Sequence, residues 1–297
     1  MKYVAVLNEE GGTLLTMDVD QFAREIARVF EEAGHTISIL RTDNKHLVQT
    51  LETAASDAEA MLVAGGDGTV SAASTVAIRS KVALAVLPAG TMNLFARSLS
   101  IPLDLNSAMT ALANGGIAKV DVGWANDRSF IHQFSVGMHP SLLRHRKRFE
   151  YKSRLGKLFA SIRATLAAIR KPPVFEADIQ TPDGSSRRRV SGIFVSNNPF
   201  EEGHLPYATE LSSGVLGLYV AAPMTTVQWL KLCISVIVGR WKANSFVSES
   251  SVKSVTLTFP RRRKRNFASI DGELIELDTT VRLKIVSGEM NVVVPQH

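Results

Sequence analysis

The sequence contains a single cysteine, Cys233, in 297 residues, which excludes an internal disulfide. A chain without disulfides suits a reducing compartment. Long hydrophobic runs are also lacking, because the longest apolar stretch, residues 227–241, is too short to cross a bilayer and contains Lys231. The N-terminal MKYVAVLNEE reaches acidic residues after only a short apolar run, so we expect no signal peptide. These absences predict a cytoplasmic protein.

Acidic residues are scarce in two segments that concentrate the net charge of +6. Residues 145–173 are dense in Lys and Arg with one acid, Glu150, and residues 261–265 read RRRKR. Such blocks suit phospholipid surfaces, nucleotides or nucleic acid, or they form a solvated face. The helix expected over 153–170 has one apolar stripe and basic residues elsewhere, which favours membrane docking and packing on a sheet equally. No aromatic-rich basic motif is present, so we expect peripheral contact with an anionic membrane and no nucleic-acid partner.

The first 120 residues alternate between predicted strands and helices. Strands are expected over 2–8, 35–42, 60–66 and 82–90, and helices over 19–34, 46–56, 69–80 and 104–115. This alternation predicts an α/β domain, residues 1–120, with a parallel sheet covered by helices on both faces. From residue 121 to 297 strands dominate, with helices over 153–170 and 226–242, which predicts a mainly antiparallel β-sandwich domain.

Small residues gather at the end of the strand over 60–66. Gly65, Gly66 and Gly68 allow a phosphate to approach the backbone, and the helix that begins at Thr69 aims its positive end at the same place. Asp67 would repel phosphate unless it holds Mg²⁺ or orders water on it. The segment therefore predicts a site for a Mg-nucleotide, although the same residues also make ordinary strand-to-helix turns.

A second loop repeats this logic one strand later. Pro88, Gly90 and Thr91 follow the strand over 82–90 and precede another helix, so the two loops can flank one ligand. Neither GxxxxGK[ST] nor GxGxxG is present, which excludes a Walker-type loop and argues against the usual dinucleotide fold.

Three motifs together resemble one family. GGDGT (65–69), PAGTMN (88–93) with LFARSLSIP after it, and IDGE (270–273) match in order and spacing the hallmarks of the diacylglycerol kinase catalytic-domain family. GGDGT alone is shared with NAD kinases and phosphofructokinases, whereas the GTMNLFAR continuation is typical of the lipid kinases. The resemblance implies a fold like that of NAD kinases and diacylglycerol kinases. It also implies ATP- and Mg²⁺-dependent phosphorylation of a lipid alcohol in the cleft between the two domains.

The resemblance also implies which residues bind the nucleotide. They are Asn8, Gly11, Gly12, Thr42, Gly65, Gly66, Asp67, Gly68, Thr69, Gly90, Thr91 and Asn93. In the family the general base lies in the DGE segment, where either Asp271 or Glu273 could accept the proton, and we choose Asp271 with Glu273 as its partner or substitute. The alternative for this segment is a plain Asp-Gly hairpin.

The sequence departs from the family at several positions. Glu9 replaces a proline, Leu94 replaces an aspartate, and Ser213 replaces an aspartate that helps to hold a second, structural Mg²⁺, so we expect that metal site to be weak or absent. His139 replaces an acid on the lipid side of the site. We therefore keep two alternatives: another GGDGT kinase such as an NAD kinase, and a non-catalytic nucleotide- or lipid-binding relative. The protein could also form a homodimer.

Overall fold

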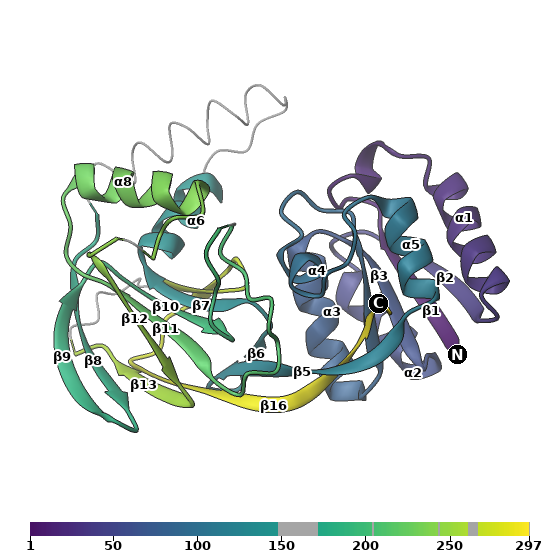
Figure 1. Cartoon of the computed structure of the whole chain (residues 1–297). Coiled ribbons are helices and arrows are strands. Elements are labelled where there is room, and N and C mark those ends of the chain that lie inside the picture. The colour runs from purple at the N-terminus through teal and green to yellow at the C-terminus, as the bar shows by residue number, and fades with distance from the viewer. Residues whose placement is uncertain (148–171, 204, 243, 261–266, 297) are drawn as a thin grey trace. The chain divides into compact units, whose positions relative to one another are not determined.

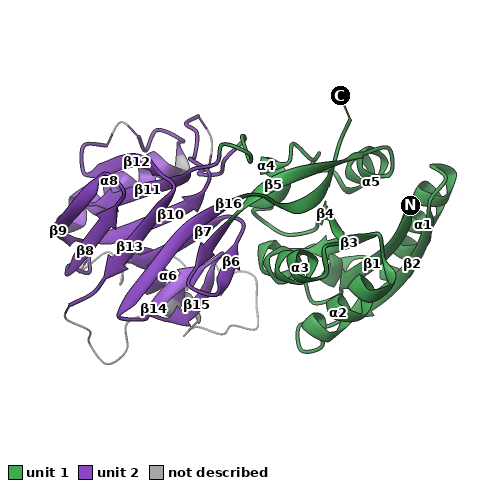
Figure 2. Cartoon of the chain, turned by 90° about the horizontal axis from the view of Figure 1, so that it is seen from below, with its two compact units in different colours: residues 1–122, 209–213, 286–297 green, residues 123–208, 214–285 purple. Residues whose placement is uncertain are grey.

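The computed structural model describes residues 1–147, 172–203, 205–242, 244–260 and 267–296 (Figure 1). The chain forms two compact units (Figure 2). Unit 1 contains residues 1–122, 209–213 and 286–297, and unit 2 contains residues 123–208 and 214–285. Unit 1 thus includes two short segments from the C-terminal half of the sequence, 209–213 and 286–297. The predicted single boundary between residues 120 and 121 assigns both segments to the other domain.

The elements of unit 1 alternate as predicted. They are β1 (Lys2–Asn8), η1 (Leu14–Thr16), α1 (Val19–Glu32), β2 (Thr36–Thr42), α2 (Leu47–Asp57), β3 (Ala60–Gly65), α3 (Asp67–Ser80), β4 (Ala83–Pro88), α4 (Leu94–Ser98), α5 (Leu105–Ala113) and the first part of β5 (Gly116–Ala125). Helix α1 has the features that its sequence predicts. Phe22, Ile26 and Phe30 are buried on one stripe, and the Asp18 carboxylate caps the helix by accepting a hydrogen bond from the backbone N–H of Gln21.

The sheet of unit 1 is parallel in the order β2-β1-β3-β4, and the end of β16 (Thr280–Val294) continues it parallel to β4 through Val292 and Leu84. Every residue of β3 and β4 is buried, as expected for central strands covered on both faces. α1 and α5 pack side by side, and so do α2 and α3, on the two faces of the sheet (Figure 1). The predicted α/β domain is confirmed.

Unit 2 is built mainly from antiparallel strands. Its elements are β6 (Arg128–Phe130), β7 (Gln133–Gly137), α6 (Met138–Lys147), β8 (Phe175–Thr181), β9 (Gly184–Val190), β10 (Gly192–Asn197), β11 (Leu216–Ala221), α8 (Thr226–Ile237), β12 (Val247–Val252), β13 (Ser254–Thr258), β14 (Phe267–Ile270), β15 (Glu273–Glu276) and most of β16.

Two sheets of unit 2 enclose a common core. One sheet has the order β12-β11-β10-β7-β14-β15, and the other contains β16, β13, β8 and β9. Phe134 and Ile193 of the first sheet and Ile179 and Leu257 of the second belong to the same cluster of buried side chains. The predicted antiparallel sandwich is confirmed, because both sheets direct alternate side chains into this core.

β6 and β7 are separate strands, and β16 is one continuous strand of 15 residues. α3 begins at Asp67, two residues before the predicted start. The helix expected over 153–170 and the RRRKR block at 261–265 lie outside the described residues. In the described part of the chain, no helix combines the length and the apolar character needed to span a membrane.

Candidate active site

The predicted nucleotide residues of unit 1 lie where three neighbouring strands end. β1 ends at Asn8, β3 at Gly65 and β4 at Pro88, and Thr42 ends β2 beside them. The sheet order reverses between β1 and β3, because β2 lies on one side of β1 and β3 on the other. Open parallel sheets bind their ligands at this kind of carboxyl-end crevice.

Asn8 connects three loops through one buried side chain. Its Nδ2 donates to Thr69 Oγ1 over 2.9 Å and to Asn44 Oδ1 over 2.9 Å, while its Oδ1 accepts from the backbone N–H of Glu10 over 3.3 Å. The residue is 1% exposed. Asn8 and Thr69 therefore fix the loops relative to one another, and the Thr69 hydroxyl, which accepts in this contact, keeps its hydrogen for another partner.

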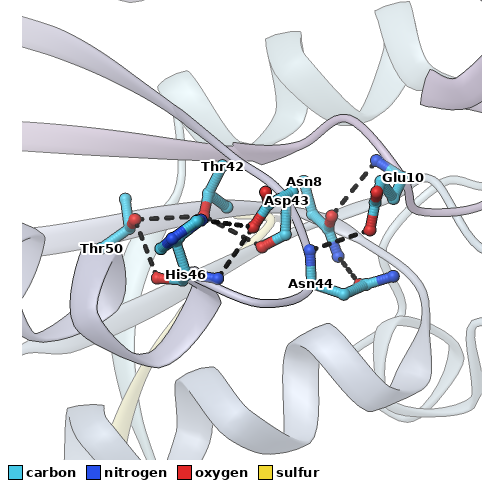
Figure 3. A network of polar contacts seen from close by, with 7 residues as sticks. All are labelled: Asn8, Glu10, Thr42, Asp43, Asn44, His46 and Thr50. Atoms are coloured by element: carbon cyan, nitrogen blue, oxygen red, sulfur yellow. Dashed lines mark hydrogen bonds and ion pairs between the residues drawn. The ribbon is translucent and has the colours of Figure 1, made fainter.

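A polar network beside Asn8 continues to the end of β2 (Figure 3). The Thr50 hydroxyl donates to the Thr42 hydroxyl over 3.1 Å, and the backbone N–H of Asn44 donates to Glu10 Oε2 over 3.1 Å. The backbone N–H of His46, donating over 2.8 Å, lowers the pKa of the Asp43 carboxyl. Sequence reasoning included Thr42 but missed Asn44 and Asp43, although both directly follow a predicted strand at the same edge.

The glycines of these loops are required by close backbone contacts. Gly12 has φ +50°, and a Cβ there would stand 2.0 Å from the carbonyl oxygen of Ala89, while the backbone N–H of Thr13 donates to that oxygen over 2.7 Å. A Cβ on Gly90 would stand 2.6 Å from Gly66 Cα. The loops after β1, β3 and β4 thus touch through their main chains, which only glycine permits.

Asp67 holds the second loop in place. Its Oδ1 accepts from the backbone N–H of Leu94 over 2.7 Å, and its Oδ2 accepts from that of Asn93 over 3.1 Å. Asn93 has φ +52°, and its Oδ1 accepts from the backbone N–H of Gly90 over 2.8 Å. The carboxylate therefore serves as an acceptor for the first amides of α4, a role that the sequence did not suggest. Each oxygen retains a lone pair for another partner.

Gly68 differs from the other loop glycines because nothing lies within 4 Å of the place where its Cβ would be. It is exposed in the first turn of α3, where backbone N–H groups have no partner within the helix. Thr91 in the second loop is exposed as well. The open space at Gly68 is where an anion could approach the helix N-terminus.

The DGE segment lies in unit 2, and Asp271 there is an acceptor for three backbone amides. Its Oδ2 accepts from the N–H of Ile131 over 3.0 Å, and its Oδ1 accepts from His132 over 3.0 Å and Gln133 over 2.9 Å. Asp271 is 9% exposed and has φ +47°. These hydrogen bonds cause the break between β6 and β7, because the amides of that segment turn toward the carboxylate.

Replacing Asp271 with Asn should destabilise unit 2. The amide presents only one acceptor oxygen, and its NH₂ group would face backbone donors, so we expect the free energy of unfolding to fall by about 2 kcal/mol or more. All three tryptophans, Trp124, Trp229 and Trp241, belong to unit 2, so tryptophan fluorescence during urea unfolding reports on this unit. The exposed Asp183→Asn variant is the control, and an equal loss in both would contradict the structural role of Asp271.

Glu273 is the exposed acid of the same segment. It begins β15 and pairs across the hairpin with Ile270. Ser213 lies in the 209–213 segment of unit 1, next to Ser212, which donates to Glu210 through its backbone N–H over 2.9 Å. Among the described residues, no group of three or more His, Cys, Asp or Glu side chains is placed to hold a metal ion.

His139 lies in the first turn of α6, and its Nδ1 is 2.9 Å from Ser135 Oγ. Burial lowers the pKa of His139 to about 4. His132 stacks on Phe200 with ring centroids 5.1 Å apart, and burial, with a smaller repulsion from His139, lowers its pKa to about 3. Both imidazoles are therefore neutral near pH 7.

These two histidines predict an acid-sensitive unit 2. The unfolded chain binds protons near pH 6.5 whereas the folded one does not, so stability is complete above pH 6.5 and falls toward pH 4. Each histidine contributes a slope of up to about 1.4 kcal/mol per pH unit. We expect His132→Gln to flatten the dependence, measured by urea unfolding at several pH values, and the exposed His46→Gln variant to leave it unchanged. Equal slopes in wild type and His132→Gln would contradict this account.

The chain thus comprises an α/β unit, with glycine-rich loops where its parallel strands end, and a β-sandwich unit. Residues 2–125 match the model of the diacylglycerol kinase catalytic domain. The resemblance predicted from the motifs is confirmed.

Similarity to known proteins extends over the whole chain. An uncharacterized protein from Synechocystis is 26% identical over 261 residues, which cover 84% of this chain and 58% of that protein. The diacylglycerol kinase of Staphylococcus aureus is 34% identical over 130 residues, which cover 41% of each chain. A crystal structure of a diacylglycerol kinase from Bacillus anthracis has a TM-score of 0.73 at 18% identity and covers 99% of this chain and 96% of its own. The matches thus span about half of these two sequence relatives, and the structural likeness shows the fold.

Proposed function

We propose that this protein is an ATP- and Mg²⁺-dependent kinase that phosphorylates a hydroxyl of a diacylglycerol-like or related lipid. The observation that supports the proposal most strongly is the loop cluster of unit 1, in which Gly12, Gly66 and Gly90 bring three main chains into contact around the start of α3. The open space at Gly68 leaves room for a phosphate at the N-terminus of a 14-residue helix.

The residues present suit a Mg²⁺ ion that arrives with the nucleotide. Mg²⁺ commonly binds through one or two carboxylates together with substrate phosphates and keeps several waters. Asp67 supplies one carboxylate at the phosphate edge, and each of its oxygens retains acceptor capacity beside a backbone N–H. When bound, the ion would neutralise phosphate charge. We propose that the second, structural metal site is weak or absent, because Ser213 offers a neutral hydroxyl.

The hydrogen bonds of unit 2 favour Glu273 over Asp271 as the acceptor of the lipid proton. Both oxygens of the Asp271 carboxylate already accept hydrogen bonds from backbone N–H groups. Glu273 is exposed two residues later. Asp271 would then hold the turn that carries Glu273, and a general base in this position is what phosphoryl transfer to a hydroxyl requires. His139 is neutral and partly exposed, and we keep it as a residue of the lipid side.

A labelled-ATP assay tests the proposal. The protein is incubated with Mg²⁺ and mixed micelles that each contain one alcohol: diacylglycerol, monoacylglycerol, sphingosine, ceramide, phosphatidylglycerol or polyprenol. We expect label in one lipid or one narrow group of lipids. Label in NAD, included as a separate acceptor, would support the rival NAD kinase, and ATP binding without transfer to any acceptor would support a non-catalytic relative.

A further inference from the structure

Four exposed apolar side chains form a stripe along α8. Val227, Leu230, Ile234 and Val238, at the end of the helix, are 62%, 44%, 51% and 60% exposed. Their spacing of three, four and four residues places them on one face of the helix. Figure 1 shows α8 at the periphery of unit 2. Scattered exposed apolar residues are ordinary, whereas a continuous stripe of this length indicates a contact surface.

The opposite face of α8 anchors the helix to unit 2. Trp229 and Leu232 are buried against Met138, Ala221 and Met224, and partly buried Cys233 and Val236 pack on the same cluster. A capping box fixes the first turn, since the Thr225 hydroxyl accepts from the backbone N–H of Gln228, whose side chain accepts from the backbone N–H of Thr225. Both faces of α8 are therefore apolar, but only one of them packs against the core of unit 2.

The charged residues in the part of the sequence that includes α8 are basic. Residues 211–248 contain no Asp or Glu. Lys231 and Arg240 are exposed and form no ion pair with any other described residue. The acids that reach this end of the helix are already engaged, because Glu249 pairs with the Lys242 ammonium over 3.0 Å and Glu202 accepts from the Lys242 backbone N–H over 2.9 Å.

We propose that the outer face of α8 docks on a lipid surface that carries anionic headgroups. The apolar stripe would enter the boundary between headgroups and acyl chains, and Lys231 and Arg240 would lie among the headgroup phosphates. A protein partner would need acidic side chains at the edges of its own apolar patch, whereas an anionic bilayer offers both features everywhere. If the protein is a lipid kinase, as proposed above, this docking would bring it to the membrane that contains its substrate.

Vesicle flotation tests this docking without ATP, so its result is independent of catalysis. Wild type, Leu230→Glu/Ile234→Glu and the control Val48→Glu/Ile117→Glu are mixed with vesicles of phosphatidylcholine containing phosphatidylglycerol. The control changes the net charge equally at residues of unit 1 that are each 54% exposed. We expect the α8 variant to partition at least about tenfold more weakly, because two apolar side chains no longer insert, and the control to bind like wild type. Tryptophan fluorescence during heating confirms that unit 2 remains folded.

A second measurement locates the contact directly. In a Cys233→Ser background, Leu230→Cys and Val48→Cys variants are labelled with a polarity-sensitive dye, which is possible because the chain has one natural cysteine. We expect a blue shift on vesicles, and quenching by brominated lipid, at residue 230 and not at residue 48. Equal binding of both glutamate variants, absence of wild-type binding, or a molar mass in light scattering that falls only in the α8 variant would each overturn the proposal, the last by assigning the stripe to a second copy.

Discussion

The Gly68→Ala protein should be at least as stable as wild type and should bind ATP at least about tenfold more weakly. Ala favours a helix over Gly by up to about 1 kcal/mol, and no atom lies within 4 Å of the added Cβ, so the folded state accepts the methyl group. If a phosphate occupies that space, the methyl group excludes it, and a tenfold loss corresponds to about 1.4 kcal/mol. Calorimetry measures both quantities, as the heat of unfolding and the heat of ATP binding.

The Ser80→Ala variant is the matched control, because it makes a helix-favouring change at the far end of α3. It should bind ATP like wild type. Gly90→Ala would not be informative, because its Cβ would collide with Gly66 Cα at 2.6 Å and disturb the loops whatever they bind. Unchanged ATP affinity in Gly68→Ala would mean that the glycine loop is only a tight turn.

The Glu273→Gln protein should bind ATP normally and transfer phosphate about 100- to 10,000-fold more slowly, the range that a general base contributes. Glu273 is exposed, so the substitution leaves the packing of unit 2 unchanged. The measurement is the initial rate with the lipid that accepts label, together with an ATP titration.

Glu276→Gln serves as the control for this variant, since it removes an exposed carboxylate from the same strand. It should keep the wild-type rate. A full rate in Glu273→Gln would exclude Glu273 as the base and return the role to Asp271. The loss of activity in the Asp271→Asn variant would then have to be distinguished from loss of folded protein. The reason is that the Asp271 carboxylate also accepts hydrogen bonds from three backbone N–H groups.

The α/β half was predictable because its signals are local. Helix α1 carries its apolar stripe and its cap within 15 residues, and the buried strands β3 and β4 are short apolar runs that end in glycine-rich loops. Parallel strands place those ends at one edge of the sheet, so the sequence predicts that the loops containing Gly66 and Gly90 lie close together.

The remaining features depend on residues far apart in sequence. The Asp271 carboxylate binds backbone N–H groups 138 to 140 residues earlier in the chain, between β6 and β7. No local sequence pattern predicts this break between the two strands. Asp67 was expected to serve a metal, yet it also accepts the amides of Asn93 and Leu94, because the second loop lies against the first. The return of residues 286–297 to unit 1 follows from β16 pairing with β4, another long-range contact.

Hydrogen exchange with and without ATP and Mg²⁺ tests the central claim most directly, because it reports which backbone amides the nucleotide covers. The account predicts slower exchange in peptides that contain residues 65–69, 88–93 and 8–13, the three loops that meet at Gly12, Gly66 and Gly90. Peptides of the core strand β8, in unit 2, should be unchanged. Protection confined to other segments, or none at saturating ATP, would contradict the assignment of these loops as the nucleotide site.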